Sequence, residues 1–221
     1  MELTKEQLAK YLDHTNLQPN ATAAQIKQTC AEALKYQTAS VCVNAHWVDL
    51  VTKELTGSGV NPIAVVGFPL GATTTEIKVA EAKQAMIDGA MEIDMVINIG
   101  EFLGGNFDFV KSDITKVAEV VHQESKLLKV IIETSYLNND QIVKACQICE
   151  VAHADYVKTS TGFSDSGAKV EDVVLMRKTV GNRLGVKASG GIHTQEEAIA
   201  MIKAGASRLG VSATVKILEG K

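Results

Sequence analysis

The chain has 221 residues, of which 46% are hydrophobic and 5% aromatic, and its formal net charge is −4 at pH 7. No basic stripe with interleaved aromatic residues is present, which argues against a nucleic-acid partner, and no apolar run reaches the ~18 residues that a membrane span needs. The first residues do not resemble a signal peptide, so we expect a cytoplasmic protein with one domain over residues 1–221 and no membrane partner.

The apolar pattern predicts strands and helices that alternate along the chain. A short helix is expected over residues 4–10, and a short extended segment over residues 11–15 follows it. Further strands are expected over residues 40–43, 62–67, 92–97, 128–133, 156–157, 184–187 and 208–211. Helices are expected over residues 22–36, 46–55, 73–88, 107–124, 138–151, 170–179, 195–203 and 213–218, with Thr22 and Thr194 as N-caps.

Eight strands, each followed by a helix, predict a single TIM (β/α)8 barrel with a short N-terminal helix. The strands read as continuous runs of β-branched residues rather than as alternating patterns, which favours parallel strands covered on both faces. A doubly wound open sheet is the alternative, but such a sheet would more often carry fewer strands at this length.

The cysteines give no sign of a redox or metal site. Cys146 and Cys149 form a C-x-x-C, but it falls inside a predicted helix and no second pair completes it. We interpret these residues as small buried thiols, and Cys42 as a core residue near a strand end. The five histidines show no metal-ligand spacing. We therefore expect no metal and no cofactor.

Lys158 ends a short apolar strand, and a turn rich in hydroxyl groups follows it at once. Poor solvation at such a position favours the neutral amine, which is the nucleophilic form of lysine. Lys187 ends the next predicted strand, and two ammonium groups in one cavity repel, so one of the two pKa values falls. Asp94, in another strand, can hold the second lysine charged and move protons. Either lysine satisfies this electrostatic argument, although the turn after Lys158 favours it as the nucleophile.

In a TIM barrel the polar residues at the C-terminal ends of the strands form the active site. Those expected there are Asp13, Thr15, Asn44, Asp94, Asn98, Glu133, Lys158, Thr159, Ser160, Thr161, Gly162, Lys187, Ser189, Gly190, Gly191 and Ser212. The glycines after the sixth, seventh and eighth strands can present backbone amides to a phosphate, with help from the short helix near residue 213, although each could simply serve a tight turn. Glu133 is better explained as an interior acid paired with a lysine, and Asp13 could be a cap.

Four motifs carry a resemblance to a known family. The segments VKTSTGF at residues 157–163 and VKASGGI at residues 186–192 resemble the paired lysine motifs of deoxyribose-phosphate aldolases. The segments LDHT at residues 12–15 and EIDMVINIG at residues 92–100 match the same family in the same order. The resemblance covers nearly the whole chain and is closest to the shorter bacterial members.

The resemblance implies a metal-independent class I aldolase. Such an enzyme reversibly cleaves 2-deoxy-D-ribose 5-phosphate to acetaldehyde and D-glyceraldehyde 3-phosphate through a lysine Schiff base, in deoxynucleoside catabolism. It implies that Lys158 forms the Schiff base, that Lys187 lowers its pKa and that Asp94 transfers protons. The implied substrate contacts are Asp13, Thr15 and Thr161 with the sugar hydroxyls, and Gly162, Gly190, Gly191 and Ser212 with the phosphate.

Some residues depart from the family pattern, and two rival functions stay open. His153 stands where glycine is usual, and Ala213 stands where a second polar residue is common, which bears on phosphate affinity. One rival is another imine-forming aldolase, which would need a basic group for a carboxylate, and Arg208 is not clearly placed at the site. The other rival is a non-catalytic sugar-phosphate-binding barrel. The oligomeric state is left open, with a homo-oligomer compatible with the sequence.

Overall fold

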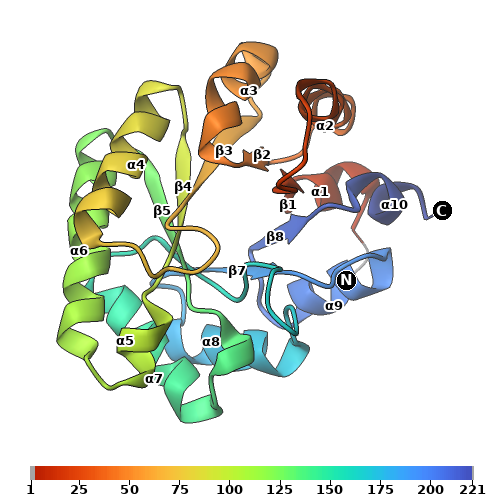
Figure 1. The fold of residues 1–221 in the computed structure, drawn as a ribbon. Coiled ribbons are helices and arrows are strands. Elements are labelled where there is room, and N and C mark those ends of the chain that lie inside the picture. The colour runs from red at the N-terminus through yellow and green to blue at the C-terminus, as the bar shows by residue number, and fades with distance from the viewer. Residues whose placement is uncertain (1–2, 221) are drawn as a thin grey trace.

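The computed structural model describes residues 3–220 and forms a closed barrel of eight parallel strands in chain order, with the last strand paired to the first (Figure 1). The strands are β1 (Leu12–Asn16), β2 (Ser40–Val43), β3 (Asn61–Val66), β4 (Glu92–Val96), β5 (Leu127–Ile131), β6 (Tyr156–Lys158), β7 (Gly185–Ser189) and β8 (Arg208–Val211). The barrel predicted from the sequence is confirmed, and the open sheet is excluded.

Helices surround the barrel, and α1 (Lys5–Ala9) precedes the first strand (Figure 1). The others are α2 (Ala23–Tyr36), α3 (Val48–Leu55), α4 (Thr75–Ile87), α5 (Ile99–Leu103), α6 (Phe107–Gln123), α7 (Asn139–Val151), α8 (Val170–Val180), α9 (Gln195–Lys203) and α10 (Thr214–Glu219), with short 3-10 segments η1 (Ala45–Trp47) and η2 (Thr134–Tyr136). Among residues 3–220, no helix combines the length and the apolar character that crossing a membrane requires.

The helix starts predicted at Thr22 and Thr194 are confirmed by complete capping boxes. Thr22 Oγ1 accepts a hydrogen bond from the backbone N–H of Gln25, and the side chain of Gln25 accepts one from the backbone N–H of Thr22. Thr194 and Glu197 make the same exchange at the start of α9. Each exchange satisfies two backbone donors that a bare helix end leaves unpaired.

Local differences from the prediction are small and have physical causes. The five-residue helix α5 was not predicted, because its start depends on Asn98, whose side chain accepts a hydrogen bond from the backbone N–H of Glu101. His153 has a φ of 63° and is a non-glycine residue in the left-handed region, as its departure from the family pattern suggested. Such a residue costs about 1 kcal/mol relative to glycine.

The interior of the barrel is divided into an apolar part and a charged part. Cys42, Ile63 and Val65 from β2 and β3 pack with Leu17 as an apolar cluster. The rest of the interior holds charged side chains from β1 and from β4 to β8. Gly210 makes room for one of them, since a Cβ there would lie 3.0 Å from Cε of Lys187. The barrel therefore carries its ionisable groups on rigid strands.

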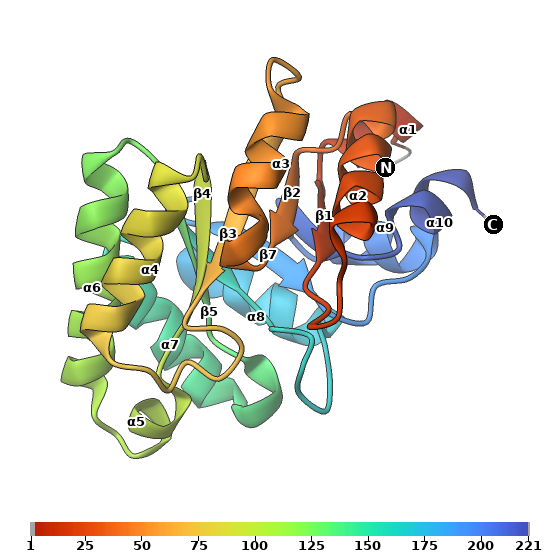
Figure 2. The ribbon, with the colours of Figure 1, turned by 45° about the horizontal axis from the view of Figure 1, so that its top comes forward.

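The loops after β1, β3 and β6 lie at the same end of the barrel, as the parallel strand directions require (Figure 2). This is the end at which the side chains that follow the strands gather.

Candidate active site

Lys158 and Lys187 lie directly opposite each other on the paired strands β6 and β7. Both Nζ atoms donate to the same oxygen, Oδ2 of Asp94 on β4, at 2.8 Å from Lys158 and 2.7 Å from Lys187. All three side chains are buried. The structure thus brings the three predicted catalytic residues together from β4, β6 and β7.

The two lysines differ in their partners and in their access to solvent. Nζ of Lys187 also lies 2.5 Å from Oδ2 of Asp13, so this lysine is held between two carboxylates and is fully buried. Lys158 pairs with Asp94 alone, and it lines the cavity at the barrel mouth. A nucleophile must reach the substrate. The geometry therefore favours Lys158 over Lys187 as the nucleophile, a choice that the electrostatics inferred from the sequence left open.

Burial and the surrounding charges together shift the two lysine pKa values in opposite directions. Burial, joined by the charge of Lys187, lowers the pKa of Lys158 despite the opposing effect of Asp94. Burial also works against protonation of Lys187, but Asp13 and Asp94 outweigh it, and the pKa of Lys187 is raised. Burial opposes ionisation of Asp94, yet the neighbouring lysines hold its pKa well below the ordinary value. Lys158 is therefore the lysine that is disposed to be a neutral amine.

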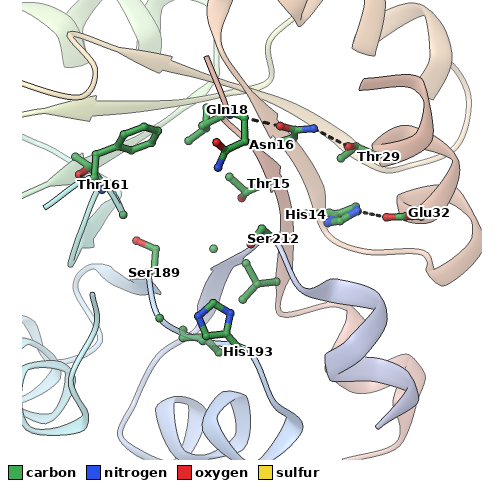
Figure 3. A pocket seen from close by; sticks show the side chains of 18 of the residues that line it. His14, Thr15, Asn16, Gln18, Thr29, Glu32, Thr161, Ser189, His193 and Ser212 are labelled. Atoms are coloured by element: carbon green, nitrogen blue, oxygen red, sulfur yellow. Dashed lines mark hydrogen bonds and ion pairs between the residues drawn. The ribbon is translucent and has the colours of Figure 1, made fainter. Parts of the chain in front are cut away.

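A cavity of about 590 Å³ opens above Lys158. Of the residues predicted to meet the substrate, those that line it are Thr15, Thr161, Gly162, Gly190, Gly191 and Ser212. Figure 3 shows Thr161 and Ser189 on one side of this space, Thr15 and Ser212 near its middle, and Gln18 contributed by the loop after β1. The wall formed by His14, Asn16, Gln18 and the facing side of α2 was not predicted from the sequence.

Asp13 lies below the cavity rather than in its wall, which differs from the predicted contact with sugar hydroxyls. It is fully buried, and its carboxylate takes the ion pair with Lys187, an ion pair with Arg208 at 2.7 Å and a hydrogen bond from Ser40 Oγ at 2.6 Å. The charges of Lys187 and Arg208 outweigh burial and hold the pKa of Asp13 below its ordinary value. Its carboxylate is therefore held by Lys187, Arg208 and Ser40 and does not line the cavity.

Glu133 has a different partner from the lysine that the sequence suggested. It sits after β5 with a φ of 52°, and its carboxylate accepts hydrogen bonds from the backbone N–H of Thr161 at 3.2 Å and from the Thr161 hydroxyl. Ser164 Oγ also donates to it at 3.1 Å. The Thr161 hydroxyl donates to Glu133 and its oxygen accepts a hydrogen bond from the backbone N–H of Phe163 at 3.0 Å, so one lone pair is left to accept from a ligand.

The glycines at the rim have the conformations that close approach to a ligand needs. Gly162, Gly190 and Gly191 have φ values of 86°, 83° and 75°, and all line the cavity. At Gly190 packing also disfavours a side chain, since a Cβ there would lie 3.0 Å from Cα of Gly167. Gly162 and Gly191 face open space, which leaves their backbones accessible.

Lys129 and Arg208 belong to the interior charge cluster, and the sequence argument did not place either there. Nζ of Lys129 lies 2.9 Å from Oδ1 of Asp94 and 2.5 Å from Oε2 of Glu92. The sequence feature that could have indicated the interior position of Lys129 is the presence of a lysine within the apolar run of β5. Neither Lys129 nor Arg208 lines the cavity. Within residues 3–220, no three His, Cys, Asp or Glu side chains gather in an arrangement that could hold a metal ion.

Comparisons with known proteins agree with this geometry. Residues 7–218 match the family model described as DeoC/LacD family aldolase. The chain is 58% identical over 211 residues to a deoxyribose-phosphate aldolase of Lactiplantibacillus plantarum, covering 96% of this chain and 98% of the relative.

Solved structures give the same result. The fold matches the aldolase QR15 with a TM-score of 0.92 and 39% identity, over 96% of this chain and 95% of that one. It also matches the deoxyribose phosphate aldolase of Aeropyrum pernix with a TM-score of 0.92 and 29% identity, over 98% of this chain and 92% of that one. The chain therefore belongs to the DeoC/LacD family of aldolases.

Proposed function

We propose that this enzyme reversibly cleaves 2-deoxy-D-ribose 5-phosphate to acetaldehyde and D-glyceraldehyde 3-phosphate through an imine on Lys158. The observation that carries the proposal is the position of Lys158, which alone among the clustered lysines lines the cavity and has its pKa lowered. Relatives with the name of this activity cover almost the full chain.

The chemistry proceeds in balanced steps. The neutral amine of Lys158 adds to the aldehyde carbon of the open-chain sugar, and uptake of one proton with loss of water gives the protonated imine. Removal of the proton from the C3 hydroxyl breaks the C2–C3 bond, releases D-glyceraldehyde 3-phosphate and leaves an enamine on Lys158. Protonation of the enamine at C2 and addition of water then release acetaldehyde and return the free amine.

Asp94 and Lys187 support the proton transfers. Their contact with Lys158 runs through the single oxygen Oδ2 of Asp94, so a proton leaving Lys158 has an adjacent acceptor that is itself hydrogen-bonded to a charged lysine. Lys187 holds its charge because it lies between Asp13 and Asp94. It therefore keeps a positive charge next to the reacting nitrogen, which favours the neutral amine.

The substrate spans the cavity from Lys158 to the glycine-rich rim. The Thr161 oxygen and the Thr15 side chain are proposed to meet the sugar hydroxyls. Backbone amides at Gly162, Gly190 and Gly191, with the hydroxyl of Ser212, are proposed to bind the phosphate. Among residues 3–220, no arginine or lysine other than Lys158 lines the cavity, so backbone amides and hydroxyls would do most of the binding.

The rival aldolase with a carboxylate substrate has less support. Such a substrate calls for an arginine or a further basic group in the cavity. Arg208 is paired with Asp13 and Glu92 beneath the site and does not line the cavity.

A direct test compares cleavage of 2-deoxyribose 5-phosphate by the unmodified enzyme and by Lys158→Leu. We expect the unmodified enzyme to release acetaldehyde and D-glyceraldehyde 3-phosphate, and the variant, folded by circular dichroism, to lose at least about 1,000-fold in kcat. A ketose phosphate and a keto acid serve as alternative substrates. A folded variant with full activity would contradict the role of Lys158, and a preference for the keto acid would favour the rival aldolase.

We also propose a cytoplasmic homo-oligomer. A phosphorylated sugar does not cross membranes unaided, so its consumption suits the cytoplasm.

The Aeropyrum pernix relative is tetrameric, and this chain exposes large apolar side chains such as Leu70 and Ile87 that a subunit contact could cover. Light scattering coupled to size exclusion measures the assembly directly, and a monomer at all concentrations would overturn this part of the proposal.

A further inference from the structure

Six charged side chains form a closed ring of ion pairs across the barrel interior, beneath the cavity. Asp94 pairs with Lys129 at 2.9 Å, and Lys129 pairs with Glu92 at 2.5 Å. Glu92 lies 3.4 Å from Nη1 of Arg208. In order, the ring contains Asp94, Lys129, Glu92, Arg208, Asp13 and Lys187, and the ion pair of Lys187 with Asp94 at 2.7 Å closes it.

Charges alternate around this ring, so each acid lies between two bases. Five of its side chains are at most 1% exposed, and Arg208 is 13% exposed at its side chain. Three carboxylates and three bases give the ring no net charge. A buried charge is tolerated when it is paired and hydrogen-bonded, and a surplus buried charge is costly.

Lys158 stands outside the ring and contacts it at one point, Oδ2 of Asp94. That oxygen already accepts a hydrogen bond from Lys187. Any proton that makes Lys158 an ammonium is therefore a positive charge in excess of the balanced ring.

The other ionisable groups near Lys158 lie outside the ring and, among the described residues, make no ion pair with Lys158. Cys42 faces it from β2, where burial raises the pKa of the thiol to about 11, so the thiol is neutral near pH 7. Glu133, after β5, is held by Thr161. The remaining ionisable residues of the cavity wall are His14, Glu32 and His193, and His14 and Glu32 pair with each other at 2.8 Å.

We propose that the ring as a whole, rather than Lys187 alone, keeps Lys158 a neutral amine, and that Glu92, Lys129 and Arg208 are positioning residues acting on it through Asp94 and Asp13. This inference rests on the proposed function. It predicts opposite effects for an acid and a base at the far side of the ring. Removing a base leaves a negative ring that draws a proton onto Lys158, and removing an acid leaves a positive ring that repels it.

The test compares Glu92→Gln, Lys129→Met and the double variant. Each is mixed with acetaldehyde and cyanoborohydride across a pH series, and the rate of reduced adduct formation on Lys158 is followed by peptide mass spectrometry. Reference to the unmodified enzyme at each pH removes the pH dependence of the reductant. We expect the midpoint of the adduct-formation rate against pH to rise by about one pH unit in Lys129→Met and to fall by a similar amount in Glu92→Gln. In the double variant the midpoint should return to that of the unmodified enzyme.

A role in stability alone would not give opposite signs and a restored midpoint. Shifts of the same sign, or no shift in folded variants, would overturn the inference while leaving the adduct on Lys158 intact. Absence of any adduct in the unmodified enzyme would instead overturn the proposed function. If either variant fails to fold, Arg208→Met and the charge-conserving Arg208→Lys test the same prediction, with a rise expected only for Arg208→Met.

Discussion

At the scale of single residues, the number of carboxylates around each amine separates the two central lysines. Lys187 lies between Asp13 and Asp94, whereas Lys158 shares one oxygen of Asp94 and reaches the cavity. The sequence could show that both lysines lie on neighbouring strands, but not how many acids each one meets. Asp13 and Arg208 are 195 positions apart, and their contact exists only because β8 closes on β1.

Lys187→Leu should slow the enzyme and move its pH profile upward. Loss of the neighbouring positive charge leaves Asp94 to favour the ammonium form of Lys158, so its pKa rises and the neutral amine appears only at higher pH. The midpoint of kcat/KM against pH should rise by about one to three units. An unchanged midpoint in a folded variant would remove Lys187 from the control of Lys158.

Glu133→Gln should weaken substrate binding while sparing imine formation. Glu133 holds the turn that carries Thr161 through the backbone N–H and the hydroxyl, and an amide cannot accept all of these hydrogen bonds. We expect KM for the sugar phosphate to rise about 10-fold, the cost of one good hydrogen bond, with a smaller change in kcat.

Acetaldehyde lacks the sugar hydroxyls, so its adduct on Lys158, reduced by borohydride, should form as readily in Glu133→Gln as in the unmodified enzyme. Ser135→Ala provides a matched control, because Ser135 contacts Ser164 in the same loop cluster but not Glu133. An equal rise in KM in both variants would point to general loosening of the loops.

At the scale of elements, the order of strands and helices followed from apolar runs, caps and glycines, and the structure confirms it. The failures are local. Helix α5 is only five residues long and contains Gly100, so its sequence has no apolar periodicity that would predict a helix. The inward direction of Lys129 was missed because a strand buried on both faces hides which side chains enter the barrel.

Thr22→Ala should destabilise the chain through α2. The substitution removes the acceptor for the backbone N–H of Gln25, while the backbone N–H of residue 22 can still donate to the side chain of Gln25. A loss of about 1 kcal/mol in the free energy of unfolding is expected in urea, with a smaller loss for Thr22→Ser. Equal stability of Thr22→Ala and the unmodified chain would show that the cap contributes nothing.

At the scale of the whole molecule, the interior charges should make stability depend on pH at both extremes. The pKa values of Asp13 and Asp94 are lowered in the folded chain, so below about pH 4 the unfolded chain binds protons that the folded chain does not, and stability falls. The pKa values of Lys129 and Lys187 are raised, so stability is also lost as the pH rises above about 10. Lys158, with a lowered pKa, contributes in the opposite direction.

Urea unfolding at a series of pH values measures this dependence. A decrease of about 2–3 kcal/mol between pH 7 and pH 3 is expected, since each of two carboxyls that stay ionised in the folded chain accounts for about 1.3 kcal/mol over that interval. A flat profile over that interval would contradict the ionised state of the buried acids.

The central claim is that Lys158 forms the imine, and one experiment addresses it most directly. The enzyme is incubated with acetaldehyde, reduced with borohydride and digested, and the modified lysine is located by peptide mass spectrometry. The reduced two-carbon adduct is expected on Lys158, with Lys129 and Lys187 unmodified because neither lines the cavity. An adduct on Lys187 instead, or on no lysine at all, would contradict the mechanism.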